Sequence, residues 1–211
     1  ASQSAPVVSA TTEVVDVPTQ PSGLGWLPDG RLLVSSMTDR TVLRLEPDGT
    51  LAVHADLTAY ADHHVNDLVT DATGRAYVGN FGYDLHHDMA ERDVPTILGD
   101  ESAGATRLVR VDPDGSVTVV AEGVRFPNGM ALIDEGRTLI LAETLRLQLT
   151  AFDVAPDGSL SNRRVWASTA PQMVASPLVA RESPTRIFMV VVLPAPLGPM
   201  NPSIRPRSSE M

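Results

Sequence analysis

Two short polar segments carry the side chains best suited to bind a ligand or a cation. Asn66-Asp67 stands directly before one apolar strand pattern, and Asn128-Gly129 stands directly before another. An amide oxygen is a neutral hard ligand suited to Ca²⁺ or a similar cation, and carboxylates can complete such a shell. The alternative is that both segments are only turn formers at the entry to a strand. Because the signal repeats at the same place in successive units, we favour a shared binding cavity.

Other residues whose side chains could take part in catalysis or metal binding give weaker signals. His63-His64 and His86-His87 are adjacent pairs, whose side chains we expect to point to opposite sides, and their spacing is not that of a zinc site. Glu143 either faces the cavity or accepts a hydrogen bond from the backbone or Arg146. No serine stands in a Gly-x-Ser-x-Gly setting, and the chain has no cysteine. We therefore expect neither serine-triad nor thiolate chemistry.

These candidates are positioned by a repeated pattern of apolar alternating runs and turns. Two alternating runs joined by a Gly-containing turn indicate a β-hairpin, because glycine tolerates a positive φ there. The second hairpin of each unit closes on Pro-Asp-Gly, at residues 47–49, 113–115 and 156–158. Four antiparallel strands in a unit of this size are typical of a propeller blade. We predict an all-β, β-propeller fold with about three recognisable blades, at about residues 23–57, 66–122 and 128–167.

The rest of the chain departs from this pattern in three places. Residues 1–12 are predicted to be a disordered N-terminal segment, preceding a partial propeller over 13–167. The second unit carries a polar, aperiodic insertion near residues 83–105, either disordered or a functional lid. Residues 168–211 form a Pro-rich, divergent and irregular tail, which disfavours central strands. We expect a repeat array cut short by an unrelated or frame-shifted tail; the alternative is a compact four-unit domain with an irregular last unit.

Composition narrows the classes of partner. The net charge is −10 and every basic residue is arginine, so we do not expect nucleic acid as a partner. The longest apolar run, residues 187–193, is much shorter than the roughly 20 residues that a membrane helix needs. We expect no membrane association. Without a visible targeting segment the default compartment is the cytoplasm, and the oligomeric state stays open.

Two longer segments carry a family resemblance. They read Asn-Asp-Leu-Val-Thr-Asp-Ala-Thr-Gly-Arg from Asn66, and Phe-Pro-Asn-Gly-Met-Ala from Phe126, each followed by a second strand. On these segments the chain resembles the SMP-30/gluconolactonase-like β-propellers, relatives of lactonases, paraoxonases and strictosidine-synthase-like proteins. The resemblance implies six blades around one divalent cation and hydrolysis of a small-molecule lactone or ester. Ca²⁺ is the first expectation for the cation, with Zn²⁺, Mg²⁺ or Mn²⁺ as alternatives.

The resemblance also implies roles for individual residues. Asn128 matches a direct metal ligand, and Asn66 matches a substrate-binding residue that also binds the metal in some relatives. Asp67 follows Asn66 in the wall of the substrate pocket. His64 stands where some relatives have an arginine that contacts substrate, and a histidine there can donate a hydrogen bond or act as a base.

Two departures from the family pattern bear on this assignment. Ser22 occupies the position of the family's first metal ligand, a glutamate. The family's last ligand, an aspartate in a Pro-Asp-Gly segment, has no counterpart after Ala167. The leading hypothesis is a metal-dependent hydrolase of a lactone or ester. The alternatives are a non-catalytic propeller that binds a small molecule or a protein, and an inactive truncated fragment.

Overall fold

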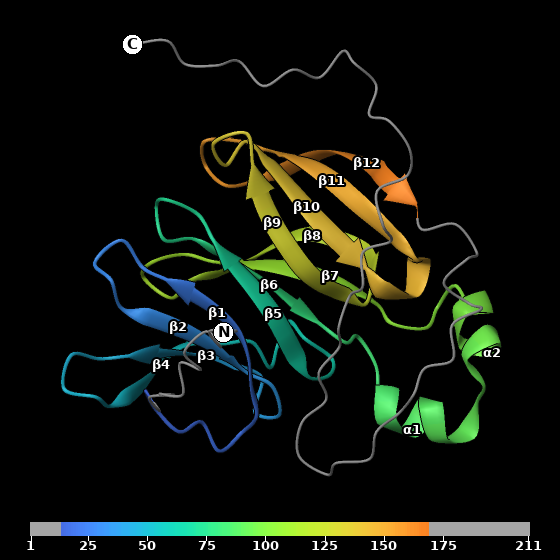
Figure 1. The fold of residues 1–211 in the computed structure, drawn as a ribbon, viewed down its shortest axis with the longest axis horizontal. Helices are drawn as coiled ribbons and strands as arrows, with labels where there is room; N and C mark the ends of the chain where they lie inside the picture. Colours follow the sequence, from blue (N-terminus) through green and yellow to red (C-terminus); the bar gives the residue numbers. More distant parts are fainter. Residues whose placement is uncertain (1–13, 169–211) are drawn as a thin grey trace, which may run out of the picture. The chain divides into compact units, whose positions relative to one another are not determined.

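The computed structural model describes residues 14–168 as three four-stranded antiparallel sheets that follow one another along the chain (Figure 1). The first sheet contains β1 (Pro21–Trp26), β2 (Leu32–Ser36), β3 (Thr41–Leu45) and β4 (Leu51–Asp56). The second contains β5 (Val65–Thr70), β6 (Ala76–Asn80), β7 (Ala105–Val111) and β8 (Val117–Arg125). The third contains β9 (Pro127–Ile133), β10 (Thr138–Glu143), β11 (Gln148–Val154) and β12 (Leu160–Ser168). The all-β prediction is confirmed; the predictions for residues 1–12 and 169–211 lie outside the described residues.

Aspartate-led turns join the strands of each sheet at one end. In five of them the Asp side chain accepts a hydrogen bond from the backbone N–H two residues on, at Asp29, Asp48, Asp71, Asp114 and Asp157. The glycines of these turns have φ between +81° and +89°, a conformation that glycine adopts without steric cost. We call the end of the strands where these turns lie the turn end. The opposite end of the strands, where β5 and β9 begin, we call the site end.

Neighbouring sheets share apolar cores. Leu33, Val42 and Leu57 pack with residues of the second sheet, including Val78 and Val109. A second cluster joins the second sheet to the third, and its members are Tyr77, Leu108, Val124, Leu139, Leu141 and Phe152. Burial of these side chains is the main force that holds one sheet against the next.

Polar contacts at the turn end reinforce the packing of the third sheet. Its turn at residues 156–158 presents three carbonyl groups to the second sheet. Arg75 donates to the Pro156 carbonyl at 2.8 Å, and Arg110 donates to the Asp157 carbonyl at 2.7 Å. The Tyr77 hydroxyl donates to the Gly158 carbonyl at 3.0 Å. The Pro-Asp-Gly turn therefore serves as a docking element between sheets as well as a hairpin turn.

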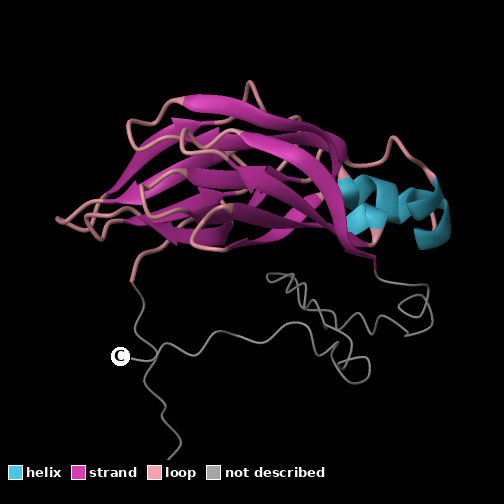
Figure 2. Ribbon diagram, turned by 90° about the horizontal axis from the view of Figure 1, so that it is seen from above, coloured by secondary structure: helices cyan, strands magenta, loops and turns pink. Residues whose placement is uncertain are grey.

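The predicted insertion forms two short helices, α1 (Leu85–Glu91) and α2 (Val94–Gly99), which the sequence analysis did not anticipate. Asp84 and Asp93 cap their N-termini through hydrogen bonds to backbone N–H groups, and Pro95 lies in the first turn of α2. Figure 2 shows both helices beyond the same end of the strands. Neither helix is long and apolar enough to cross a membrane, nor is any other helix within residues 14–168.

An apolar cluster fastens this insertion to the site end. Ile97 of α2 packs with Phe81, which follows the end of β6, and with Phe126, which lies between β8 and β9. The Arg125 side chain is 2 % exposed, and its guanidinium donates to the Asp100 and Ala103 carbonyls just after α2. The insertion is thus a docked structural element next to the candidate site.

Candidate functional site

Asn66 and Asn128, which open β5 and β9, lie in contact at the site end. The Asn66 Nδ2 group donates to Asn128 Oδ1 at 3.3 Å and to the Pro127 carbonyl at 2.9 Å. Both side chains are buried. The second residues of β5 and β9 therefore place their amides in one polar cluster between two consecutive sheets.

The backbone around Asn66 is held by contacts that the sequence analysis did not identify. Ser35 at the end of β2 is fully buried; it accepts a hydrogen bond from the Gly23 N–H at 2.7 Å and donates to the Asn66 carbonyl. Gly79 lies so close that a Cβ there would sit 2.8 Å from Asn66 Oδ1. Asn66 Oδ1 is buried and accepts no hydrogen bond within the described part of the chain. A buried carbonyl oxygen without a partner is costly, and a bound ligand would satisfy it.

Asn128 is oriented by the first residue of η1 (Thr144–Arg146). Its Nδ2 group donates to the Thr144 hydroxyl at 3.3 Å, and the Thr144 N–H donates to the Phe126 carbonyl at 3.1 Å. Phe126 has φ of +50°, which is uncommon for a residue other than glycine. The residues just before Asn128 are therefore fixed in an unusual conformation by their neighbours.

Asp67 and Ser22 form a second pair beside the amides. The Ser22 hydroxyl lies 3.4 Å from Asp67 Oδ1, within the range of a long hydrogen bond. Burial raises the pKa of Asp67, and the hydrogen bond from Ser22 opposes that effect. Asp67 Oδ2 lies 4.0 Å from the position of a Cβ on Gly129, next to Asn128. Ser22 therefore contacts Asp67, the acidic residue of the predicted pocket wall.

His64 lies among other aromatic rings at the site end. Its ring centroid is 4.5 Å from that of His63, 5.7 Å from that of Phe81 and 6.3 Å from that of His86. Burial, followed by the neighbouring imidazoles of His63 and His86, lowers the pKa of His64. The expectation that adjacent histidines point to opposite sides is wrong for His63 and His64, because the pair precedes β5 and strand alternation does not apply there.

Glu143 accepts hydrogen bonds from the backbone, as one of the two interpretations predicted. The Arg125 N–H donates to its carboxylate at 2.8 Å, and Arg146 and Arg163 form ion pairs with it at 3.0 and 2.9 Å. Burial raises the pKa of Glu143, but the hydrogen bonds from Thr150, the Arg125 N–H and Arg163 outweigh it and keep the pKa below its usual value. Glu143 therefore has a structural role: its carboxylate holds the end of β8, just before Asn128 in the sequence.

Among the predicted residues, the structure brings Asn66 and Asn128 into contact and places Asp67 next to them on β5. It groups His64 with other histidines instead. Ser35 and Thr144 were missed. Their only signal in the sequence is a polar side chain at or just after a strand end, which many residues share.

The oxygen donors at this site fit a divalent cation in kind. The amide oxygens, the Asp67 carboxylate and the Ser22 hydroxyl are hard ligands of the type that Ca²⁺ prefers, and Asn66 Oδ1 lacks a hydrogen bond. They carry only one formal charge. Within residues 14–168 no three His, Asp or Glu side chains converge on one point. We therefore expect any cation held by these four residues alone to bind weakly.

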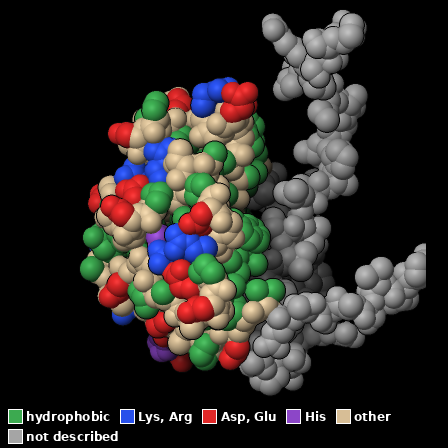
Figure 3. Space-filling model, turned by 90° about the vertical axis from the view of Figure 1, so that its left-hand side faces the viewer, with side chains coloured by type: hydrophobic (Ala, Val, Ile, Leu, Met, Phe, Trp, Pro, Cys, Tyr) green, Lys and Arg blue, Asp and Glu red, His purple; other side chains and the backbone are tan. Residues whose placement is uncertain are grey.

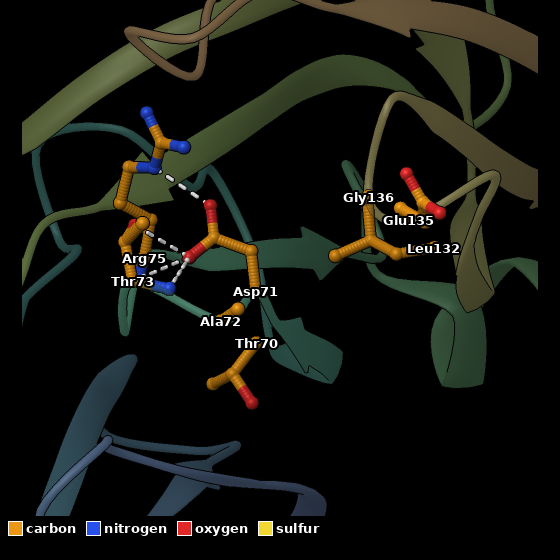
Figure 4. Close-up of a pocket in the computed structure, with 8 residues that line it drawn as sticks. All are labelled: Thr70, Asp71, Ala72, Thr73, Arg75, Leu132, Glu135 and Gly136. Atoms are coloured by element: carbon orange, nitrogen blue, oxygen red, sulfur yellow. Dashed lines mark hydrogen bonds and ion pairs between the residues drawn. The ribbon is translucent and has the colours of Figure 1, made fainter.

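A separate hollow of about 220 Å³ lies at the turn end, between the turns of the second and third sheets (Figure 4). Figure 4 shows Asp71 with both carboxylate oxygens engaged, one by Arg75 and the other by the residues of its own turn. The Asp71 carboxylate is therefore already satisfied by hydrogen bonds from Thr73 and Arg75. We do not regard this hollow as the functional site.

Comparison with known proteins relates the chain to one family and to several solved folds. The family described as SMP-30/Gluconolactonase/LRE-like region matches residues 5–177. A luciferin-regenerating enzyme shares 17 % identity over 73 % of this chain and 49 % of its own, with a TM-score of 0.57. Regucalcin from Agrobacterium tumefaciens, described as a calcium-binding protein, shares 20 % identity over 70 % of this chain and 45 % of its own, with a TM-score of 0.53.

A structure from a nidogen/laminin complex matches with a TM-score of 0.53 at 14 % identity, over 74 % of this chain and 52 % of its own. At these identities the solved structures establish the β-propeller fold. The chain spans about half the length of each of these three solved chains.

Proposed function

Because the chain belongs to the SMP-30/gluconolactonase/LRE-like family, we propose that it is a hydrolase of a small-molecule lactone or ester that works with a divalent cation. The observation that carries this proposal is the contact between Asn66 and Asn128, together with the unpaired Asn66 Oδ1. The calcium-binding description of the regucalcin neighbour supports Ca²⁺ as the first choice.

Four residues would hold the cation: Asn66, Asn128, Asp67 and Ser22. When bound, such an ion polarises an ester carbonyl and lowers the pKa of a bound water molecule. Asp67 would supply the one carboxylate of the set, which is ionised when it binds a cation. The amides would orient the substrate through their fixed hydrogen bonds.

Calorimetric titration with Ca²⁺ and a panel of lactones and aryl esters tests this proposal. We expect Asn128→Ala to weaken Ca²⁺ binding by about tenfold or more and to reduce turnover in parallel. Asn162→Gly is a matched control, because Asn162 is exposed on β12 and its φ of +51° suits glycine. Absence of both Ca²⁺ binding and turnover in the intact protein would contradict the proposal.

Ser22 supports a second candidate, a non-catalytic propeller that binds a small molecule or a protein. A serine in place of a carboxylate leaves the site with less charge than the family pattern supplies. We expect Ser22→Glu to raise Ca²⁺ affinity by about tenfold or more, because added ligand charge strengthens Ca²⁺ sites. If the unmodified protein binds no Ca²⁺ and hydrolyses no ester, while Ser22→Glu binds Ca²⁺, the non-catalytic candidate is the correct one.

A further inference from the structure

The first and third sheets each turn one face away from the other sheets of the described region. Leu33 and Val42 lie on the face of the first sheet that packs on the second sheet. Leu139 and Leu141 lie on the face of the third sheet that packs on the second sheet. Successive side chains of a strand point to opposite faces. The residues that alternate with these four therefore lie on the opposite faces, which we call the free face of the first sheet and the free face of the third sheet.

The free face of the first sheet is apolar from β1 to β4. Cross-strand pairing groups eight apolar side chains on it: Leu24, Trp26, Leu32, Val34, Leu43, Leu45, Leu51 and Val53. Val17, which precedes β1, packs against part of this face, but Leu24, Trp26 and Val53 remain 51 %, 57 % and 63 % exposed. The face of an antiparallel sheet that meets water usually carries polar side chains. This composition is instead typical of a face that another layer covers.

The free face of the third sheet is also apolar, but its side chains are smaller. Its apolar residues are Ala131, Ile133, Ile140, Ala142, Leu149 and Ala151. The charged residues that share this face on β11 and β12, Asp153 and Arg164, form an ion pair of 2.6 Å with each other. A partner that covers this face therefore buries no unpaired charge there, and the small side chains leave room for large ones opposite.

The molecule already contains two junctions between faces of these two kinds. Leu24, Leu68 and Met130 occupy corresponding positions, because each is the fourth residue of its strand, in β1, β5 and β9 respectively. Leu68 packs with the first sheet and Met130 with the second, so this position faces the preceding sheet. Val69, the next residue, packs with the third sheet, and its counterpart Ala131 lies on a free face. The free face of the first sheet is thus of the kind that packs on a preceding sheet, and the free face of the third sheet is of the kind that packs on a following one.

We propose that two copies of this chain associate through these faces, with the free face of the first sheet of each copy packed on the free face of the third sheet of the other. The same pairing of faces holds the first sheet to the second and the second to the third. Two such contacts relate the copies by a two-fold axis and close a ring of six sheets, three from each copy. This number lies within the range of about 4–8 blades found in propellers. The net charge of −10 opposes the association at long range, so added salt should strengthen it.

Sedimentation equilibrium of the full chain across the micromolar concentration range tests the proposal. We expect a concentration-dependent dimer of twice the chain's 22.5 kDa, with a lower dissociation constant at higher salt. Trp26→Glu and Ala131→Glu each place a charge on one free face; both side chains are exposed in the single chain, so the fold should tolerate the changes. We expect each to raise the dissociation constant by about tenfold or more. Met89→Glu is the matched control, because Met89 is an exposed apolar residue on α1 and lies on neither free face. Circular dichroism of each variant checks that the sheets remain folded.

Mixing the two interface variants separates contacts between unlike faces from contacts between like faces. In either variant alone, both contacts of the ring carry one added charge. In a mixed dimer of Trp26→Glu with Ala131→Glu, one contact is unaltered, and one unaltered contact can hold two chains together without the other. We therefore expect the mixture to associate more tightly than either variant does alone.

Four results would overturn the proposal. A monomer at every concentration would assign the free faces to another occupant, and an equal loss of association in Met89→Glu would place the contact elsewhere. A mixture no tighter than the separate variants would show that unlike faces do not meet. A series of growing oligomers in place of a dimer would show that two copies do not close a ring. None of these readouts depends on Ca²⁺ or on turnover, so they are independent of the proposed hydrolase activity.

Discussion

At the scale of single residues, buried polar side chains position the candidate site. Glu143 is fully buried, and its carboxylate binds Arg146, Arg163 and the Arg125 N–H. This contact anchors the backbone three residues before Asn128. Breaking it should affect both stability and the geometry of the amide pair.

We predict that Glu143→Gln lowers the free energy of unfolding by about 1.5–3 kcal/mol, because it weakens hydrogen bonds to a buried charge. Glu135→Gln is the control: Glu135 is 84 % exposed and its ion pair is with exposed Arg137, so its loss should cost less than about 0.5 kcal/mol. Urea unfolding of both variants measures the difference. Equal effects of the two substitutions would contradict the structural role of Glu143.

The sequence could predict some of these residues and not others. Asn66 and Asn128 were identified because each opens a recognisable unit, so their repetition revealed a shared place in the fold. Ser35 could not be identified, since its bond to the Asn66 carbonyl joins different sheets and depends on how the sheets pack. The ring contact between His63 and His64 was not expected, because a rule for strands was applied to two residues that precede β5.

At the scale of elements, close approach of inner strands sets the spacing between sheets. β1 packs directly on β5 at Gly23, where a Cβ would lie 2.2 Å from the Leu68 backbone nitrogen. The strand pairing and the turns were predictable because alternation and Asp-Gly signals are local. The helices α1 and α2 were not predicted, because they are too short to show a clear apolar period, although Asp84 and Asp93 were available as capping signals.

We predict that Gly23→Ala destabilises the protein by about 1–3 kcal/mol or more, because the added methyl group overpacks a backbone contact. Gly99→Ala in α2 is the matched control: it has open space around it, so the change should be neutral or stabilising by up to about 1 kcal/mol. Thermal unfolding followed by circular dichroism compares the two. Similar melting temperatures for both variants would show that β1 and β5 can separate without cost.

A second prediction at this scale concerns β4, where His54 is buried and Arg44 lies 3.2 Å from its Nδ1 atom. Burial, followed by the charge of Arg44, lowers the pKa of His54 from its usual 6.5. Below about pH 6.5 the unfolded chain therefore binds a proton that the folded chain does not, and stability falls as the pH falls.

We expect His54→Gln to reduce this pH dependence, measured as urea unfolding free energies between about pH 7 and pH 5. Part of the dependence should remain, because the pKa of His64 is lowered as well. His87→Gln serves as a control, since His87 is exposed on α1. An unchanged slope in His54→Gln would refute the assignment.

At the scale of the whole described region, each sheet shares a core with the next. The first apolar cluster spans the first and second sheets, and the second cluster spans the second and third. Coupling of this kind makes neighbouring units unfold together. Charged side chains of both signs are interspersed on the surface that Figure 3 shows.

We predict that the first and third sheets unfold in a single transition. The two tryptophans, Trp26 on β1 and Trp166 on β12, report on these sheets separately. Both are more than half exposed, so Trp26→Phe and Trp166→Phe should cost little stability. Fluorescence of the two single-tryptophan variants in urea should give coincident midpoints; separated midpoints would mean that the sheets are independent.

The aspartate-led turns have a practical consequence. The residues around Gly30, Gly49 and Gly136 leave open space at the edge away from the amide pair. Exposed loop tips of this kind are where added peptide is best tolerated. An attachment sequence placed after Gly49 would anchor the protein to a sensor surface by the turn end, with the site end on the side away from that surface.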